Sequence, residues 1–556
     1  MMNKSKIYFP DYIFYNGSVH TVDKNDSIYE ATAVSGNKIV AVGNNDEILS
    51  MKTENTVLID LKGRSLLPGI NDAHNHAWET GLMLEGIVLF GINSMKMLQE
   101  KIKERIKEVP EGTWIQGGSW IESQFEENRA PNRYDLDIAS PDNAVVLERI
   151  FGACSVNSKA LELAGITKDT VDPPKGHIEK DEKGEPTGVL HGNAVLLVRK
   201  VMPGPFGSDD FGAGEGEPSI PVLEKSISLA INEYNKYGIT SITEPGVSSG
   251  VCKAYHDLLK KNELKCRINL MPNWHGFTLQ QNEKELEQLL EDYNFSTGYG
   301  NNWIRYSSLK MAIDGGLTSM TALKSWNYKG EDSLREFPLR LDITKLDEYI
   351  KSAHDSGWDI GIHVMGDVAI DKAVDAIYKA VKANPRKHQH SIIHAYYPSE
   401  ETLKKMSEVG IMVAAQASFI YVEADGYDSL LPRDKQTSFT PLKTYKDNGI
   451  IVSLTTDMPC SNLNPFINMY AAVTRKGSRG YSLGDEEKIT KAEALRMMTY
   501  NGAVLNGEEK FKGSIETDKL ADLIIIDKDL SQVSDEDIKN IKVDLTMLDG
   551  KIIYQR

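Results

Sequence analysis

Cysteine is scarce in this sequence, with four among 556 residues, and no two of them form a CxxC pair. Domains that depend on disulfides are much richer in cysteine, and disulfides persist mainly in oxidising compartments. The scarcity excludes a disulfide framework and is typical of a protein kept in a reducing compartment. We therefore expect a cytoplasmic protein.

Long apolar runs are also missing. Pro10, Asp11 and Asn16 interrupt the first residues before any apolar stretch reaches the length of a signal peptide, and no later run approaches a membrane span. Positive charge is in deficit, since 63 Lys and Arg face 80 Asp and Glu, which gives a net charge of -17. These absences argue against a membrane protein and against a broad surface for nucleic acid or anionic lipid. A small molecule is the expected partner.

Both ends of the chain contain short β-type runs separated by turns. Examples are YIFYNG and ATAVSGNKIVAVG within residues 1–64, and GSIETDKLADLIIID and VDLTMLDGKIIYQR within residues 511–556. The two ends are predicted to pair into one small β-sandwich. The length allows this module beside a larger domain.

Between these ends, apolar β-branched runs alternate with amphipathic helical stretches, which is the pattern of parallel βα units. Eight such runs indicate an α/β fold, a closed TIM-type (β/α)8 barrel with its active site at the carboxyl ends of the strands. The first barrel strand falls within residues 65–79 and the remainder of the barrel within 236–510. The runs cover residues 64–72, 238–245, 266–274, 303–314, 359–364, 390–395, 411–418 and 450–457.

Residues 80–235 are too many for a single βα connection. We predict that they form an inserted α/β subdomain that covers the mouth of the barrel. The most loop-like stretch, rich in glycine and proline, covers residues 203–221 and suits either a lid or a surface linker.

The first barrel strand closes with the sequence Asp72-Ala-His74-Asn-His76. Side chains two residues apart on a strand point to the same side, so both imidazoles can reach one point. Pairs of this kind also arise by chance, and hydrogen-bonded core or loop histidines are the alternative interpretation. The position at the end of a barrel strand favours a pair of metal ligands.

Three further residues stand at the carboxyl ends of predicted strands, namely His363, His394 and Asp457. Together with His74 and His76 they converge on the face where barrel enzymes carry out their chemistry. A divalent ion lowers the pKa of a bound water molecule and polarises a carbonyl group. Asp457 can bind such an ion and serve as the general base that later protonates the leaving nitrogen.

Lys310 lies in the fourth predicted strand and shares its parity with Asp314. A lysine that points into a barrel is costly unless it is paired or neutralised. Carbamylation by carbon dioxide is one solution, because it produces a carboxylate that can bridge two metal ions. A salt bridge to Asp314 or another carboxylate is the other, and the residues alone leave both open.

The motifs LLPGINDAHNH, HVMGD, IIHA, TTDMP and GSIETDKLADLIIID occur in an order and spacing that resemble the amidohydrolase superfamily. The resemblance is closest to its amidohydrolase-3 branch, which contains YtcJ-like and N-substituted formamide deformylase-like proteins, and it covers nearly the whole chain. It implies a metal-dependent amidohydrolase that cleaves a non-peptide C–N bond of a small molecule, such as an amide, an N-substituted formamide or a cyclic amide.

The resemblance also implies roles for individual residues. The metal ligands are His74, His76, His363 and His394, with Asp457 as both ligand and acid–base residue. It supports Lys310 as a carbamylated bridge between two divalent ions, most commonly Zn²⁺, whereas an unmodified Lys310 would leave a single ion. A homodimer is the expected assembly.

Two segments depart from the family pattern. Relatives often carry a histidine near Ala153 or Cys154, and a glutamate where this chain reads His191-Gly192-Asn193. Both segments belong to the predicted insertion, so the substrate cannot be transferred from a relative. Weaker candidates for lining the substrate pocket are Trp78, Trp120, Glu122, Arg149 and Asn157, although packing tryptophans and ordinary surface groups give the same pattern.

Three alternative functions remain at the level of the sequence. A deaminase would use the same scaffold and release ammonia, where an amidase releases a carboxylate and an amine. A lyase or isomerase would use Asp457 to abstract a carbon-bound proton and would take up no oxygen from water. A non-catalytic binding protein is disfavoured, because all expected ligand positions are retained.

Overall fold

The computed structural model describes residues 9–556 apart from 150–151, 175, 204–217, 276–287, 289, 291–293, 335–336 and 338. The glycine-rich stretch 203–221, which suits a lid or a linker, therefore lies largely outside the described residues. Within the described part, no helix combines the length and apolarity needed to cross a membrane.

Parallel strands form the centre of the fold, and strands occur in all eight predicted runs. They are divided between two sheets, ordered β17-β16-β15-β8 and β18-β19-β20-β21-β22. The run 303–314 supplies both β17 and β18, because the strand is interrupted at Ser307 and Ser308. The bounds are β8 (Ile70–Asp72), β15 (Ile239–Val247), β16 (Arg267–Pro272), β17 (Ile304–Tyr306), β18 (Leu309–Ala312), β19 (Ile360–Val364), β20 (Ser391–His394), β21 (Met412–Ala415) and β22 (Val452–Leu454).

Hydrogen bonds connect the two sheets at both of their seams. At one seam, Asn273 pairs in parallel with Lys310, and the Trp274 N–H donates to the Lys310 carbonyl over 2.9 Å. At the other, the Thr456 N–H donates to Asp72 Oδ1 over 2.9 Å. The carboxyl ends of all these parallel strands therefore face one side of the molecule.

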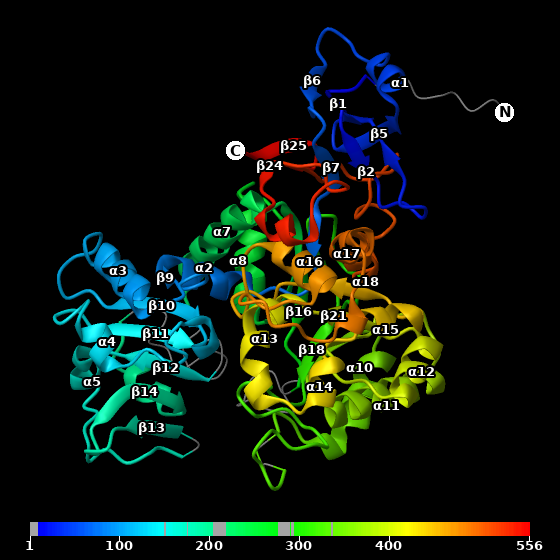
Figure 1. Ribbon diagram of the computed structural model, residues 1–556. Helices are drawn as coiled ribbons and strands as arrows, with labels where there is room; N and C mark the ends of the chain where they lie inside the picture. The colour runs from blue at the N-terminus through cyan, green and yellow to red at the C-terminus, as the bar shows by residue number, and fades with distance from the viewer. Residues whose placement is uncertain are drawn as a thin grey trace.

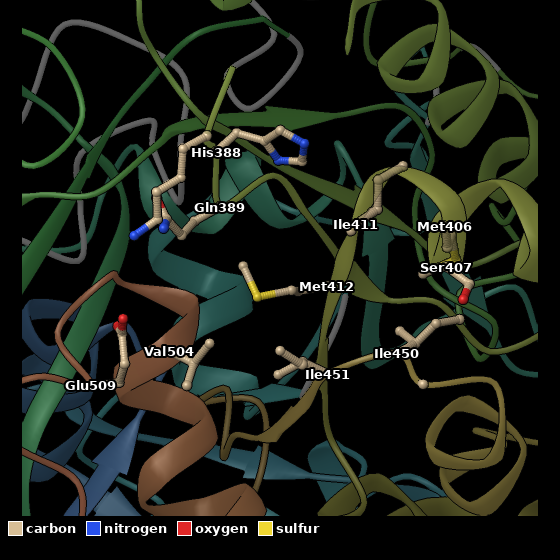
Figure 2. Close-up of a pocket in the computed structure, with 13 residues that line it drawn as sticks. His388, Gln389, Met406, Ser407, Ile411, Met412, Ile450, Ile451, Val504 and Glu509 are labelled. Carbon is tan, nitrogen blue, oxygen red and sulfur yellow. The ribbon is translucent and has the colours of Figure 1, made fainter. Parts of the chain in front are cut away.

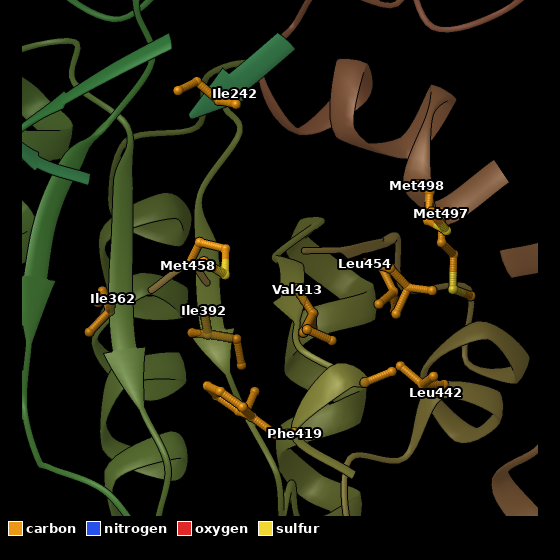
Figure 3. Packing of buried hydrophobic residues seen from close by; sticks show 14 of the residues in the cluster. Ile242, Ile362, Ile392, Val413, Phe419, Leu442, Leu454, Met458, Met497 and Met498 are labelled. Atoms are coloured by element: carbon orange, nitrogen blue, oxygen red, sulfur yellow. The ribbon is translucent and has the colours of Figure 1, made fainter. Parts of the chain in front are cut away.

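Helices pack around the outside of these sheets (Figure 1). The alternation along the strands explains this packing, because Ile362 belongs to the main apolar core while its neighbour His363 points to the other face. Ile392, Val413 and Phe419 lie in the same core (Figure 3). The helices are α2 (Ala77–Glu85), α7 (Ile220–Lys236), α8 (Ser249–Lys260), α10 (Leu346–Asp355), α11 (Asp367–Ala383), α12 (Glu400–Val409), α13 (Ser418–Leu430), α14 (Arg433–Thr437), α15 (Leu442–Asp447), α16 (Pro465–Thr474), α17 (Lys491–Met498) and α18 (Tyr500–Leu505), with 3-10 turns η3 (Ile343–Lys345) and η4 (Asp485–Glu487).

The segment between the first two parallel strands folds around a sheet of its own, ordered β13-β14-β12-β11-β10-β9. Two separate apolar cores flank this sheet, one centred on Trp120 and Leu147 and the other on Cys154 and Leu190. In Figure 1 it stands to one side of the parallel strands. Its elements are β9 (Ile87–Val88), α3 (Met95–Ile106), β10 (Ile115–Trp120), η1 (Glu122–Gln124), α4 (Arg133–Asp137), β11 (Val145–Arg149), β12 (Ala153–Val156), α5 (Ser158–Leu163), β13 (Gly176–Lys180), β14 (Pro186–Gly192) and α6 (Val195–Arg199).

The two chain ends meet in a pair of sheets, ordered β5-β4-β1-β6 and β25-β24-β23-β7-β2-β3. Phe14 and Val34 of the first sheet share one apolar core with Leu66, Leu523 and Met547 of the second. The bounds are β1 (Tyr12–Tyr15), β2 (Ser18–His20), β3 (Ile28–Tyr29), β4 (Ala31–Ser35), β5 (Lys38–Gly43), α1 (Asn45–Leu49), β6 (Val57–Asp60), β7 (Ser65–Pro68), β23 (Leu523–Ile526), η5 (Asp535–Asn540), β24 (Val543–Leu548) and β25 (Lys551–Gln555).

The run predicted as the first barrel strand is shared between two sheets. Residues 65–68 pair with β2 and β23, and only β8 pairs with the parallel strand β15. The change occurs at Gly69, where a Cβ atom would lie 2.2 Å from Thr240 Oγ1. A glycine is required there because the neighbouring strand passes so close.

Arg267 ties β16 to the sheets built from the chain ends. Its side chain is 1% exposed, and its Nε and Nη2 atoms donate to the two oxygens of Asp522 over 2.6 and 2.9 Å. A third contact joins Nη2 to Asp549 Oδ1 over 2.9 Å. Removing one partner of a buried ion pair leaves the other charge uncompensated, which costs about 3–5 kcal/mol.

We therefore expect Arg267→Met to lower the free energy of unfolding by about 3–5 kcal/mol, measured by urea unfolding at pH 7. Burial alone would raise the pKa of Asp522, but Arg267 and the hydrogen bonds outweigh it and hold that pKa below its usual value. The pair's contribution is thus present above pH ~4 and is lost as the pH falls through the lowered pKa. Lys253→Met, at an exposed pair with Asp257 on α8, is the control and should cost less than about 1 kcal/mol. Equal losses in the two variants would contradict this account of Arg267.

Candidate metal centre

The predicted ligands lie at the carboxyl ends of the parallel strands. His74 and His76 follow β8, and Asp457 follows β22. The Nε2 atoms of His74 and His76 are each 3.4 Å from Asp457 Oδ1. One ligand atom from each of the three residues lies within 4.8 Å of the other two, which is a spacing that one ion can span.

The remaining predicted ligands adjoin this trio. The His394 ring centroid is 5.9 Å from that of His74 and 4.4 Å from that of His363. Lys310 Nζ lies 3.5 Å from His74 Nε2. The structure therefore brings all six predicted ligands together from five different strands.

Burial lowers the pKa of most cationic groups in this cluster. For His76 it is outweighed by Glu79 and Asp457, which raise the pKa of that imidazole to about 10. Burial, the larger cause, and nearby cationic groups, the smaller one, hold the pKa of His74 and of His363 well below the usual value of a histidine. Burial likewise lowers the pKa of His394 to about 4 and that of Lys310 to about 7. Neutral imidazoles are the form that binds metal ions.

Hydrogen bonds fix the tautomer of His394. Gln416 Nε2 donates to Thr455 Oγ1 over 2.7 Å and to the Ala414 carbonyl over 3.2 Å, so Gln416 Oε1 is left as the acceptor. His394 Nδ1 lies 2.7 Å from that oxygen and must carry the proton. The lone pair of His394 is then on Nε2.

Two of the ligand segments have left-handed backbone. His394 and Ala395 have φ values of 72° and 50°, and Asp457 has φ 57°. Such conformations cost roughly 1–3 kcal/mol each for residues other than glycine, and they concentrate at functional sites. The bond from the Asp457 N–H to the His74 carbonyl, at 3.0 Å, holds one of these turns.

Two buried carboxyl groups accept hydrogen bonds from the turns that adjoin the candidate ligands. Asp314 accepts the backbone N–H groups of Leu323, Met365 and Gly366 over 2.8 to 3.0 Å. Asp72 accepts the N–H and hydroxyl groups of Thr456, the residue before Asp457. Asp314 therefore holds the turn after β19, and Asp72 holds the turn after β22.

The predicted substrate-lining residues are dispersed. Trp78 is half-buried on α2 and packs against the main core. Trp120 lies in the core of the insertion, and its Nε1–H donates to the Leu147 carbonyl over 2.8 Å. Asn157 is fully buried, caps α5 and donates to two backbone carbonyls. The polar groups of Trp120 and Asn157 thus form hydrogen bonds with backbone carbonyls of their own segment, rather than pointing freely towards a substrate.

Glu122 and Arg149 form a bidentate ion pair in the segment between the first two parallel strands. Arg149 Nε and Nη2 lie 3.0 and 2.9 Å from the two Glu122 oxygens. Nearby, the Ser119 hydroxyl donates to the Pro459 carbonyl over 2.8 Å, and Ile121 packs with Val422. Since Pro459 is two residues from Asp457, this edge of the insertion borders the metal cluster.

Near the ligands, Glu79 and Gln416 have roles that the sequence did not reveal, whereas Glu244, at the end of a predicted strand, suits a place beside the site, at the surface or in a helix cap from the sequence alone. The Glu79 carboxylate lies 2.9 Å from His76 Nδ1, Gln416 orients His394, and the Glu244 carboxylate accepts the Ala77 N–H. The spacing of Glu79, one helical turn after His76, is the only local signal among them. Glu244 and Gln416 are far from their partners in the sequence, and only the folded structure brings them together.

The described residues also form a cavity of about 230 Å³ at the opposite, amino ends of β20, β21 and β22. His388, Gln389, Met412, Ile451 and Val504 line it (Figure 2). Because the ligand candidates follow the carboxyl ends of the strands, this cavity is separate from the candidate metal centre.

The donor set fits a divalent transition metal. Imidazole nitrogens and a carboxylate suit Zn²⁺ and its neighbours, and buried unpaired donors require a partner. His74 Nδ1 is buried without a hydrogen-bond partner among the described residues. The cluster is therefore consistent with a bound ion.

Comparisons with known proteins agree with this geometry. The chain is 26% identical to an N-substituted formamide deformylase of Arthrobacter pascens, over 98% of both chains. It is also 26% identical to the putative amidohydrolase YtcJ of Bacillus subtilis, over 98% of this chain and 99% of the relative. A solved structure of an uncharacterised metal-dependent hydrolase from Pyrococcus furiosus superposes with a TM-score of 0.69 at 25% identity, covering 93% of this chain and 99% of the other. The amidohydrolase family profile (Amidohydro_3) matches residues 57–554, and the chain therefore belongs to the amidohydrolase family.

Proposed function

We propose that this chain is a metal-dependent hydrolase that cleaves a non-peptide C–N bond of a small molecule. The observation that carries the proposal is the convergence of His74, His76 and Asp457, whose ligand atoms lie within 4.8 Å of one another. The family membership and the lowered pKa values of His74 and His363 support it.

We also infer that the two parallel sheets form one interrupted (β/α)8 barrel, and that residues 80–235 are an insertion in it. The hydrogen bonds at both seams support this reading. A barrel places the six ligand candidates around one axis, at the end where such folds carry their active sites.

A divalent ion would be held by His74, His76, His363, His394 and Asp457. The imidazole-rich set favours Zn²⁺. When bound, the ion lowers the pKa of a water molecule towards neutrality and polarises the substrate carbonyl. Asp457 then removes a proton from the attacking water as its oxygen bonds to the carbonyl carbon. Asp457 returns that proton to the nitrogen as the C–N bond breaks, which yields a carboxylate and an amine.

Lys310 is the proposed site of carbamylation. Its Nζ lone pair would attack the carbon of CO₂, and loss of one N–H proton would leave a carbamate with a single negative charge. The burial of Lys310, at 1% exposed, and its 3.5 Å contact with His74 Nε2 support a place for this carbamate among the candidate ligands, where it would supply a carboxylate to a bound metal.

Product analysis tests the reaction class. Zinc-loaded protein is incubated in H₂¹⁸O with N-substituted formamides, N-acyl amines, cyclic amides and aminopurines, and products are identified by mass spectrometry. We expect an amine together with a carboxylate that contains one ¹⁸O atom, at a rate at least tenfold above chelated protein. Ammonia release from the aminopurines alone would favour a deaminase, and product without ¹⁸O would contradict hydrolysis.

A further inference from the structure

Helix α2 begins directly after His76 without a side-chain cap of its own. Its first N–H, on Ala77, donates instead to Glu244 Oε2 over 2.8 Å, from the neighbouring strand β15. The Tyr255 hydroxyl donates to the same oxygen. A carboxylate at this position also interacts favourably with the positive end of the helix dipole, so Glu244 anchors the helix that starts at His76.

Helix α2 is held on its other side by α7. A Cβ atom on Gly81 would lie 1.9 Å from the Ser226 carbonyl oxygen, so the two helices are in close backbone contact there. The Thr80 hydroxyl donates to the His76 carbonyl over 2.7 Å. The first turn of α2 therefore has little freedom to move.

Glu79, in that first turn, meets the imidazole of His76. Glu79 Oε2 lies 2.9 Å from His76 Nδ1, and the two side chains are 14% and 13% exposed. On the other side of the ring, His76 Nε2 lies 3.4 Å from Asp457 Oδ1. A carboxylate that accepts the second N–H of a ligating imidazole fixes the ring and raises its basicity.

The environment of His76 differs from that of His394. His394 is oriented by the neutral amide of Gln416, whereas His76 faces two carboxyl groups, those of Glu79 and Glu244. One ligand atom from each of His76, Glu79 and Glu244 lies within 4.8 Å of the other two. Glu244 is 0% exposed, and its Oε1 atom has no hydrogen-bond partner among the described residues. Two carboxyl groups thus lie behind one ligand of the proposed site, and burial raises the pKa of Glu244 to about 8.

We propose that Glu79 is a positioning residue that strengthens metal binding through His76. Glu244 keeps Glu79 close to His76 because it anchors the start of α2. The inference depends on the metal centre of the proposed function. It predicts that removal of the Glu79 carboxylate weakens the affinity for the ion and leaves the fold unchanged.

The test is the Kd for Zn²⁺ of the metal-depleted full chain, measured by competition with a chromophoric chelator, beside its thermal midpoint. We expect Glu79→Leu to raise Kd by roughly 10- to 100-fold, because the carboxylate that lies beside His76 Nδ1 is removed. Glu79→Gln keeps an acceptor but loses the charge and should raise Kd by a smaller factor, of about three or more. The control is Glu85→Gln at the far end of α2, where Glu85 pairs with Lys225, and its Kd should be unchanged.

The outcomes separate this inference from the proposed function. A parent chain that binds no Zn²⁺ contradicts the metal centre itself. A parent that binds Zn²⁺ while Glu79→Leu has the same Kd and only a lower thermal midpoint shows that Glu79 is structural, which overturns the inference. Should Glu79→Leu fail to fold, an unchanged Kd in Glu79→Gln has the same meaning.

Discussion

Asp457→Asn is expected to lower kcat by roughly 10²- to 10⁴-fold, the usual contribution of a positioned general base. The amide keeps an oxygen that can face His74 and His76 but cannot accept the proton of the attacking water. The metal content should therefore stay close to that of the parent while turnover is lost. Steady-state kinetics with the best substrate from the product screen, beside metal analysis, measure both quantities.

Asp447→Asn is the matched control, because this aspartate pairs with Lys443 on the exposed helix α15. Its kcat should equal that of the parent. If Asp457→Asn retained more than about a tenth of the parent's kcat with its metal in place, another group would have to be the base.

Lys310→Ala is expected to lower kcat/KM by roughly 10²- to 10⁴-fold, which corresponds to several kcal/mol of lost transition-state stabilisation. The reason is that, in the proposed site, a carbamate on Lys310 would serve as a metal ligand, and alanine supplies none. The truncated side chain leaves space beside His74, so a small carboxylate such as acetate can occupy the position. The rescue is measured by activity assays with and without acetate at roughly 100 mM, a concentration high enough for a weakly binding ligand to occupy the site.

A structural lysine would behave differently. If Lys310 served only in packing or in a salt bridge, acetate would not restore activity, and bicarbonate would not affect the parent. Lys324→Ala, at another buried lysine, serves as the comparison, because acetate should not alter its activity. Rescue in both variants would contradict a specific carboxylate site at Lys310.

The parallel strands and the ligands at their ends were predictable because both depend on local pattern. β-Branched runs mark strands, and the period of two places His74 and His76 on one side. The ends of parallel strands meet on one face, so His363, His394 and Asp457 could be grouped without knowledge of the turns that carry them.

Residues that act through tertiary contacts could not be identified in this way. Gln416 meets His394 from the next strand, and Glu244 meets α2 from β15, with no spacing rule to link them. Asn157 illustrates a related difficulty, because a polar residue in a loop can serve as a helix cap, as Asn157 does for α5, as well as a substrate ligand. Such roles depend on which backbone groups the fold leaves without partners.

Breaks within strands were equally difficult to predict. The run 303–314 looks continuous, yet β17 and β18 belong to separate sheets. Residues 64–72 also look like one strand, but the close approach of Thr240 at Gly69 divides it between the end sheets and the parallel strands. These breaks arise from packing against distant segments.

The most direct test of the account is the metal content per chain, measured by inductively coupled plasma mass spectrometry on protein purified without chelator and with bicarbonate, beside Lys310→Ala. The account predicts about two divalent ions in the parent and a clear loss in the variant, as expected for a carboxylate-bridged pair. One ion in both proteins would remove the bridge and leave a mononuclear hydrolase. A parent that contains no divalent ion, and gains no activity when zinc is supplied, would contradict the central claim.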